Sequence, residues 1–237
     1  MRIKRHLQLI VVTTVAVLVC SAVMDPHLKA IYYAKLGEHQ KSVDNYTKYI
    51  GSYANPMDLK LLGSYYSRGY EYLQLKQYQM AIDDFDKYIS PNSKYSGSLN
   101  AAAYGWRGCA YKELGQYQKA IDDYTQWVNL APKYAAAYQN RGTVYTKFGQ
   151  YQKAVDDCTM AINLDPKFAW AYSSRGNAYI KLGLYQKAVD DYTQWINLDP
   201  KSSLAYASRA IAYQWLKKQD LAKNDKETAE KLGYQPE

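Results

Sequence analysis

The feature of this sequence that most constrains its fold is an arginine that recurs at equal intervals in front of a small residue. Arg107, Arg141 and Arg175 each precede a glycine, Arg209 precedes an alanine, and a tyrosine follows three positions after each small residue. A fixed period of about 20–50 residues is typical of repeat proteins, in which each copy buries its apolar face against its neighbours. Copying of one short pattern also explains a composition of 27 tyrosines against 3 phenylalanines.

The spacing inside one copy predicts two helices. Tyr138, Gly142 and Tyr145 follow at i, i+4 and i+7, which places them on one face of a first helix. Gly142 and Ala154 are small, as is needed where two helices cross closely, and Pro166 ends the copy because proline cannot continue a helix interior. Each copy is therefore predicted to be a helical hairpin.

The copy resembles the tetratricopeptide repeat family, whose pattern is Trp-x2-Leu-Gly-x2-Tyr, Ala-x3-Phe and Pro over about 34 residues. The matching positions are Tyr138, Arg141, Gly142, Tyr145, Ala154, Cys158 and Pro166. The chain departs from the family consistently, with tyrosine at the tryptophan position and arginine before the glycine. The resemblance implies an all-α fold, an α-solenoid of helix-turn-helix repeats that forms a right-handed superhelix.

Four clear repeats are expected within residues 62–202, enough for a stable array. They span 62–95, 101–134, 135–168 and 169–202. A degenerate first repeat and linker occupy 25–61, where Asp25-Pro26 is a plausible helix start, and a final repeat-like unit with a capping helix occupies 203–237. Stretches rich in turn-forming residues predict inter-repeat loops at Gly51–Lys60 and Ser90–Asn100.

The last expected helix is polar where its predecessors are apolar, as suits a helix that caps an array against solvent. Its polar run is Lys223, Asn224, Asp225, Lys226 and Glu227. We expect these side chains to face water.

The recurring arginines are more simply explained as structural than as anion ligands. The second helix of each clear repeat carries a pair of aspartates, such as Asp156-Asp157. A half-buried arginine needs a carboxylate partner, and one aspartate of each pair can lie close enough for a charge-assisted hydrogen bond. A ladder of arginine–aspartate pairs is therefore expected along the array.

The resemblance also implies where a ligand would bind, because first helices line the concave side in this family and its members mostly hold peptides or protein segments there. Projected onto that surface, the first helices present Tyr66, Tyr70, Gln74, Trp106, Cys109, Lys112, Gln139, Asn140, Thr143, Lys147, Trp170, Ser174, Asn177, Lys181, Ile211, Gln214 and Trp215. Amides that can pair with an extended backbone, together with aromatic rings that can hold apolar side chains, suit a peptide or protein ligand.

Other chemistries find little support in the sequence. All three histidines, His6, His27 and His39, lie near the N-terminus, and the acidic residues form a regular ladder, so neither catalysis nor a metal or cofactor site is expected. The net charge is +8 but scattered, without the basic stripe that nucleic-acid binding requires. Cys109 and Cys158 are expected to be packing residues, not a disulfide framework.

The segment 1–24 is predicted to be a signal peptide or a signal anchor in the form of a transmembrane helix. A basic start is followed by an uncharged run at Leu7–Val23, which approaches the length of roughly 20 residues needed to span a bilayer. Cys20-Ser21-Ala22 permits cleavage, and lipidation at Cys20 stays open. The charge distribution places the repeats on the outer side of the membrane, either anchored or exported after cleavage.

We therefore expect a non-enzymatic scaffold or adaptor that holds a partner's peptide or protein segment in the concave groove. The alternative left open is a structural or self-associating array in an envelope complex, without a peptide ligand. The residue pattern alone does not separate these two functions.

Overall fold

The computed structural model describes residues 25–52, 59–89 and 98–235. The predicted signal or anchor of residues 1–24 lies outside the described residues, as do 53–58 and 90–97 of the predicted loops. Within the described ranges all regular structure is helical, and none of these helices is both long and apolar enough to cross a membrane. The chain divides into two compact units, residues 1–94 and 95–237.

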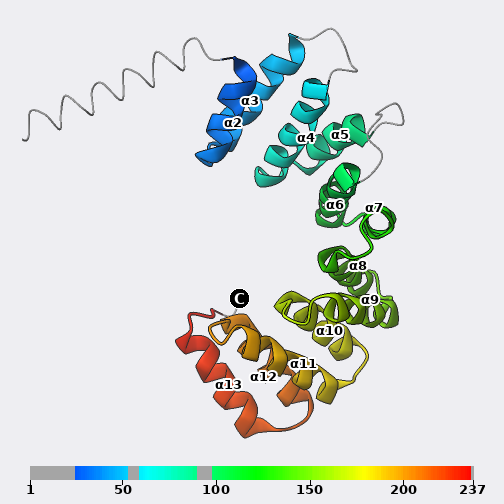
Figure 1. Ribbon diagram of the computed structural model, residues 1–237. Helices are drawn as coiled ribbons and strands as arrows, with labels where there is room; N and C mark the ends of the chain where they lie inside the picture. The colour runs from blue at the N-terminus through cyan, green and yellow to red at the C-terminus, as the bar shows by residue number, and fades with distance from the viewer. Residues whose placement is uncertain (1–24, 53–58, 90–97, 236–237) are drawn as a thin grey trace, which may run out of the picture. The chain divides into compact units, whose positions relative to one another are not determined.

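The first unit contains two helical hairpins, coloured blue to cyan-green in Figure 1. Its helices are α2 (Pro26–Lys35), α3 (His39–Gly51), α4 (Leu59–Gln74) and α5 (Tyr78–Ile89). Asp25 caps α2 by accepting a hydrogen bond from the backbone N–H of His27, and Pro26 opens the helix. The stretch treated as degenerate in sequence is thus a complete hairpin.

The second unit is a row of hairpins in which each helix packs on the next (Figure 1). Its helices are α6 (Ser98–Glu113), α7 (Tyr117–Leu130), α8 (Ala135–Lys147), α9 (Tyr151–Leu164), α10 (Ala169–Lys181), α11 (Tyr185–Leu198), α12 (Ser203–Trp215) and α13 (Gln219–Lys231). First helices of neighbouring repeats also meet, as α8 and α10 do. The expectation of an all-α array of paired helices is confirmed.

The recurring glycine permits the close crossing inside each hairpin. A Cβ atom at Gly176 would lie 2.6 Å from Cε1 of Tyr192, and one at Gly142 would lie 2.7 Å from Sγ of Cys158. Both separations are shorter than van der Waals contact, so only glycine fits these first helices against the second. Cys158 is fully buried, as expected for a packing residue.

The expected ladder of arginine–aspartate pairs is present and is bidentate. Arg141 donates from Nε and Nη2 to the two carboxylate oxygens of Asp157, at 2.7 and 2.8 Å. The guanidinium also lies over the rings of Tyr138 and Tyr145, 5.9 Å from each centroid. The equivalent pairs are Arg68–Asp84, Arg107–Asp123, Arg175–Asp191 and Arg209–Asp225. The repeated tyrosines therefore flank a repeated ion pair.

Two local expectations were wrong. Asp225 does not face solvent with the rest of the polar run in α13: it is buried, and it pairs with Arg209 as a further member of the ladder. The predicted inter-repeat loops were also too long, because Gly51 belongs to α3, Lys60 to α4 and Asn100 to α6. A helix end is set by tertiary packing as well as by local turn propensity.

Candidate functional site

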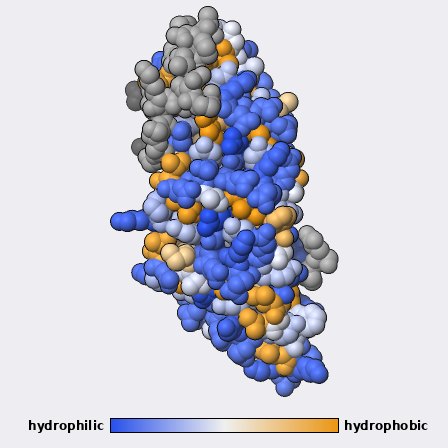
Figure 2. Space-filling view, turned by 90° about the vertical axis from the view of Figure 1, so that its right-hand side faces the viewer, coloured by the Kyte–Doolittle hydropathy of each residue, from blue (hydrophilic) through white to orange (hydrophobic). Residues whose placement is uncertain are grey.

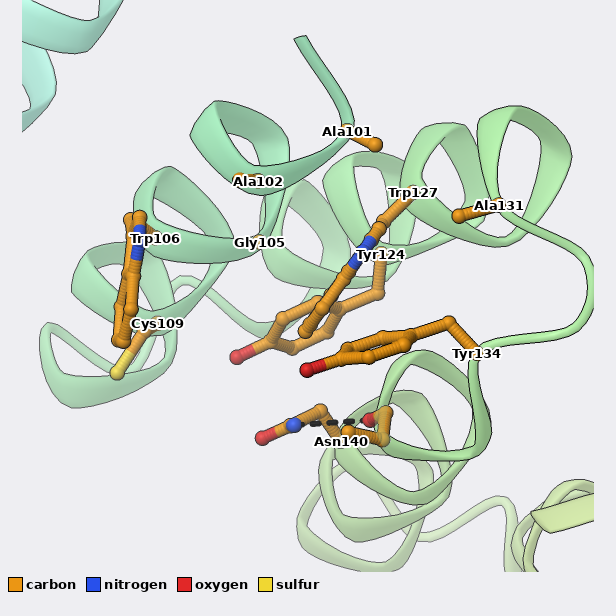
Figure 3. A pocket seen from close by; sticks show the side chains of 11 residues that line it. Ala101, Ala102, Gly105, Trp106, Cys109, Tyr124, Trp127, Ala131, Tyr134 and Asn140 are labelled. Atoms are coloured by element: carbon orange, nitrogen blue, oxygen red, sulfur yellow. Dashed lines mark hydrogen bonds between the residues drawn. The ribbon is translucent and has the colours of Figure 1, made fainter. Parts of the chain in front are cut away.

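A pocket of about 510 Å³ opens in the second unit between α6, α7 and the start of α8 (Figure 3). Its lining residues are Ala101, Ala102, Gly105, Trp106, Cys109, Tyr124, Trp127, Ala131, Tyr134, Ala136 and Asn140. Figure 3 shows Trp106 and Cys109 on one side and the rings of Tyr124, Trp127 and Tyr134 on the other. The volume falls in the range of roughly 300–1,000 Å³ that is usual for ligand pockets.

The pocket exists because small residues occupy positions that are larger in other repeats. Ala102 and Ala136 stand where the repeat at 169–202 has Trp170. Gly105 lets the Trp127 ring lie against α6, since a Cβ atom there would be 2.8 Å from Cε3 of that ring. The Trp170 ring lies 5.7 Å from the ring of Trp195 in its own hairpin. Trp127 is the counterpart of Trp195, but Ala102 brings no ring to it. The opening therefore follows from residues that are particular to this pair of hairpins.

The floor of the pocket carries a buried hydroxyl without an internal partner. The side chain of Tyr124 is 1% exposed, and its hydroxyl makes no hydrogen bond to any residue that the structure describes. Its counterpart two repeats later, Tyr192, donates to Oδ1 of Asn177 at 2.7 Å. Cys109 occupies the position equivalent to Asn177, so the hydrogen-bond acceptor is missing. Burial raises the pKa of Tyr124 well above its usual value, which keeps the hydroxyl protonated.

Asn140, which lies on α8, closes one end of the pocket. Its Nδ2 donates to the backbone oxygen of Ala136 at 2.9 Å, which fixes the orientation of the amide. In Figure 3 the Asn140 carbonyl oxygen and the hydroxyls of Tyr124 and Tyr134 all point toward the side where Trp106 lies. The pocket thus combines apolar walls with polar atoms gathered at one end.

Three residues selected from the sequence line this pocket: Trp106, Cys109 and Asn140. Sequence reasoning missed Tyr124, Trp127 and Tyr134, because it considered first helices only. A comparison of the small residues at equivalent positions in successive repeats could have located the opening. It would not have shown which rings surround it.

Several other predicted groove residues bond to one another across the repeats. Gln139 Nε2 donates to Ser174 Oγ at 2.8 Å, and the hydroxyls of Thr143 and Ser174 lie 3.1 Å apart. Ser174 is only 8% exposed. Together with the bond between Tyr192 and Asn177, these contacts tie α8 to α10 and α10 to α11. These polar groups stabilise the array, whatever else they bind.

The remaining predicted residues are spread over both units. Trp170 and Trp215 are 56% and 59% exposed, and Trp215 stacks on Tyr185 with ring centroids 5.4 Å apart. Four more of these residues are exposed on first helices: Lys147, Lys181, Ile211 and Gln214. Lys112 forms an ion pair in which its Nζ lies 2.8 Å from Oε1 of Glu113. Tyr66, Tyr70 and Gln74 lie on α4 in the first unit, where the Tyr66 ring packs against Phe85 and Tyr88.

The face of the molecule that Figure 2 shows is mostly hydrophilic. The face in Figure 2 shows small separate hydrophobic clusters among hydrophilic side chains, not one broad apolar sheet. Recognition on such a surface depends on discrete pockets more than on total apolar area.

Groups that could carry other chemistry are dispersed in the described part of the chain. Its His, Cys, Asp and Glu residues form no group of three or more suited to a metal ion. The thiols of Cys109 and Cys158 are both unpaired, and burial raises the pKa of each, which disfavours the reactive thiolate.

A row of helical hairpins with an open pocket between neighbours defines a repeat protein whose surface is suited to ligand recognition. Two family models, both described as tetratricopeptide repeat, match the chain, one at residues 62–94 and 101–134 and the other at 135–168 and 169–202. These segments make up more than half of the sequence. The chain belongs to the tetratricopeptide repeat family.

Solved structures with the same fold include MamA, at 26% identity and a TM-score of 0.60, covering 69% of this chain and 93% of that one. A tetratricopeptide repeat protein from Parabacteroides merdae has 18% identity and a TM-score of 0.76, covering 89% of this chain and 79% of its own. The C-terminal part of a repeat protein from Cytophaga hutchinsonii has 22% identity and a TM-score of 0.67, covering 86% and 77%. The last two identities support the fold alone. No curated protein matches the sequence.

Proposed function

We propose that this chain is a non-enzymatic protein-interaction scaffold that holds a segment of a partner protein against the first helices of the second unit. Membership of the tetratricopeptide repeat family supports this role, because such repeats typically serve as scaffolds for protein binding. The observation that carries the proposal is the pocket of about 510 Å³ between α6, α7 and α8, with apolar walls and polar atoms at one end. This combination suits a side chain presented by an extended segment.

We further propose that the repeats lie on the outer side of a membrane, with residues 1–24 as a cleaved signal or a retained anchor. The support is the basic start and the uncharged run at Leu7–Val23. Protease treatment of intact cells tests this placement. Digestion of the repeats in intact cells agrees with it, and protection until the membrane is broken contradicts it.

The binding role is tested by crosslinking and capture from native cells, with the full-length chain as bait. The test variant changes Trp106 and Asn140 to alanine, which removes one wall and the polar end of the pocket. The matched control changes Met160 and Leu198 to alanine, which are exposed apolar residues on the second helices α9 and α11. Both variants should unfold at temperatures close to that of the native chain.

The expected result is a defined partner that the native chain and the control capture and the pocket variant loses. Capture of the same proteins by all three forms would refute the proposal. If the chain captures only copies of itself and its solution mass grows with concentration, the array is self-associating and the scaffold role is wrong.

A further inference from the structure

We infer that the pocket between α6, α7 and α8 binds a tyrosine side chain of the partner segment, with the phenol hydroxyl placed between Tyr124 and Asn140. This inference rests on the proposed scaffold function and names the group that the scaffold recognises. It follows from three properties of the pocket: its apolar walls, its unsatisfied hydroxyl and its fixed amide.

The walls of the pocket suit a planar ring. Trp127 and Tyr134 lie 5.4 Å apart between ring centroids at an angle of 40°, and Trp106 stands opposite them (Figure 3). Aromatic rings prefer such tilted or edge contacts with other rings. Ala102 and Ala136 leave open the space that Trp170 takes in the repeat at 169–202, and Gly105 lets the Trp127 ring lie directly against α6. An aromatic side chain can therefore enter beside Trp127.

The polar end of the pocket suits a ligand side chain that ends in a hydroxyl better than one that ends in an apolar group. A phenol hydroxyl can accept one hydrogen bond and donate another. Tyr124 offers a donor that has no partner among the described residues, and Asn140 offers a carbonyl oxygen whose amide nitrogen is already bonded to Ala136. One ligand hydroxyl can satisfy both. A phenylalanine side chain would leave the Tyr124 hydroxyl unsatisfied.

The chain itself contains the bond that the ligand would reproduce. In the repeat at 169–202, the hydroxyl of Tyr192 donates to the amide oxygen of Asn177. At the pocket, Cys109 takes the place of that asparagine. The Tyr124 oxygen is covered by the pocket lining, so an entering ring must displace part of the lining to reach it. The Trp106 ring, which is 37% exposed, lies across the pocket from Trp127 and Tyr134 (Figure 3).

The test uses p-cresol as the tyrosine side chain and toluene as the phenylalanine side chain. The full-length chain is titrated with each compound while the indole N–H signals of its five tryptophans are followed by NMR. Saturable shifts are expected at Trp106 and Trp127, with Trp170, Trp195 and Trp215 as internal references. The p-cresol affinity should exceed the toluene affinity by at least roughly three- to tenfold, because each of the two neutral hydrogen bonds contributes about that factor.

Three variants assign the effect to the pocket. Tyr124→Phe should lower the preference for p-cresol by roughly three- to tenfold, because only the bond to Asn140 is left, while toluene still binds. Cys109→Asn should weaken p-cresol binding, because the new amide can occupy the Tyr124 hydroxyl as Asn177 occupies Tyr192. Ala102→Trp should block both compounds, since it places a ring beside Trp127 as Trp170 lies beside Trp195.

The matched control is Tyr192→Phe, which removes the equivalent hydroxyl outside the pocket and should leave the preference unchanged. Equal affinities for p-cresol and toluene, or a preference of unchanged size in the Tyr124→Phe chain, would overturn the inference. If p-cresol shows no preference but the pocket variant still loses the partner in the capture experiment, tyrosine recognition alone is refuted. If the pocket variant captures the partner as the native chain does, the scaffold function itself is refuted.

Discussion

Arg141 joins two hairpins, because the guanidinium that holds Asp157 also donates from Nη1 to Thr125 Oγ1 at 3.2 Å. Thr125 lies on α7, in the preceding repeat, whereas Asp157 lies on α9 in the same repeat as the arginine. Arg175 and Arg209 each make the same three bonds, reaching back to the threonine of the repeat before. The ladder therefore links successive repeats as well as the two helices of each hairpin.

Replacing Arg141 with alanine should lower the free energy of unfolding by about 3 kcal/mol, because it leaves the buried carboxylate of Asp157 without a partner. Urea unfolding of the full-length chain at neutral pH measures the change. In a chain that also carries Asp157→Ala, the total loss should be smaller than the sum of the two single losses. Additive losses would mean that the two side chains stabilise the array independently.

Two chemically identical changes should differ in their effect on stability. Tyr192→Phe removes a hydrogen bond to Asn177 and should cost about 1 kcal/mol. Tyr124→Phe removes a hydroxyl that has no partner among the described residues, so it should be neutral or slightly stabilising. Thermal unfolding of both variants in one buffer makes the comparison. Equal losses would show that the Tyr124 hydroxyl already has a partner in solution.

Gly176→Ala should destabilise the second unit by about 1–3 kcal/mol, because the added methyl group would lie 2.6 Å from the Tyr192 ring. Gly63→Ala is the matched control: it also lies in a helix, but its added methyl group meets no atom within 4 Å. Removing a helical glycine there should raise stability by about 0.5–1 kcal/mol. The same sign of change at both positions in chemical unfolding would contradict the crossing geometry.

Acid should weaken the first unit through His27. Its ring packs 4.9 Å from the Tyr49 ring, and Nδ1 lies 3.0 Å from Ser64 Oγ. Burial lowers the pKa of His27; Asp25 opposes the shift, and Lys60 adds to it. A folded-state pKa below the unfolded value of about 6.5 gives stability that is present above pH 6.5 and is lost as the pH falls toward the folded-state pKa.

The measurement for His27 is the thermal unfolding of the first unit at pH 7.5 and pH 5.5, in the native chain and in His27→Gln. His39 is present in both chains, so its contribution cancels in the comparison. The native chain should lose more stability on acidification than the variant. An identical pH dependence in the two chains would exclude His27 as the source.

Much of the fold could be predicted from the sequence because the repeat fixes its own geometry. The helical pairing follows from the spacing of Tyr138, Gly142 and Tyr145, and the ion pairs follow from a charged group that needs a partner when buried. The same reasoning at Arg209 would have found Asp225, since every ladder aspartate follows its arginine at the same separation in sequence. The polar run around Asp225 obscured that regularity.

The candidate site was less predictable because it depends on contacts between different repeats. Projection onto first helices found Trp106 and Asn140, but not the bond from Gln139 to Ser174, which forms only when neighbouring repeats stack. The pocket depends on the missing side chains at Ala102 and Ala136, and an absent side chain is visible in sequence only by comparing one repeat with the next.

The three-way bonds of Arg141, Arg175 and Arg209 have a consequence for unfolding. Opening one hairpin from α8 onward breaks hydrogen bonds to the hairpin before it as well as its own. The loss of one hairpin therefore weakens its neighbour, so that the unfolding of adjacent hairpins in the second unit is coupled.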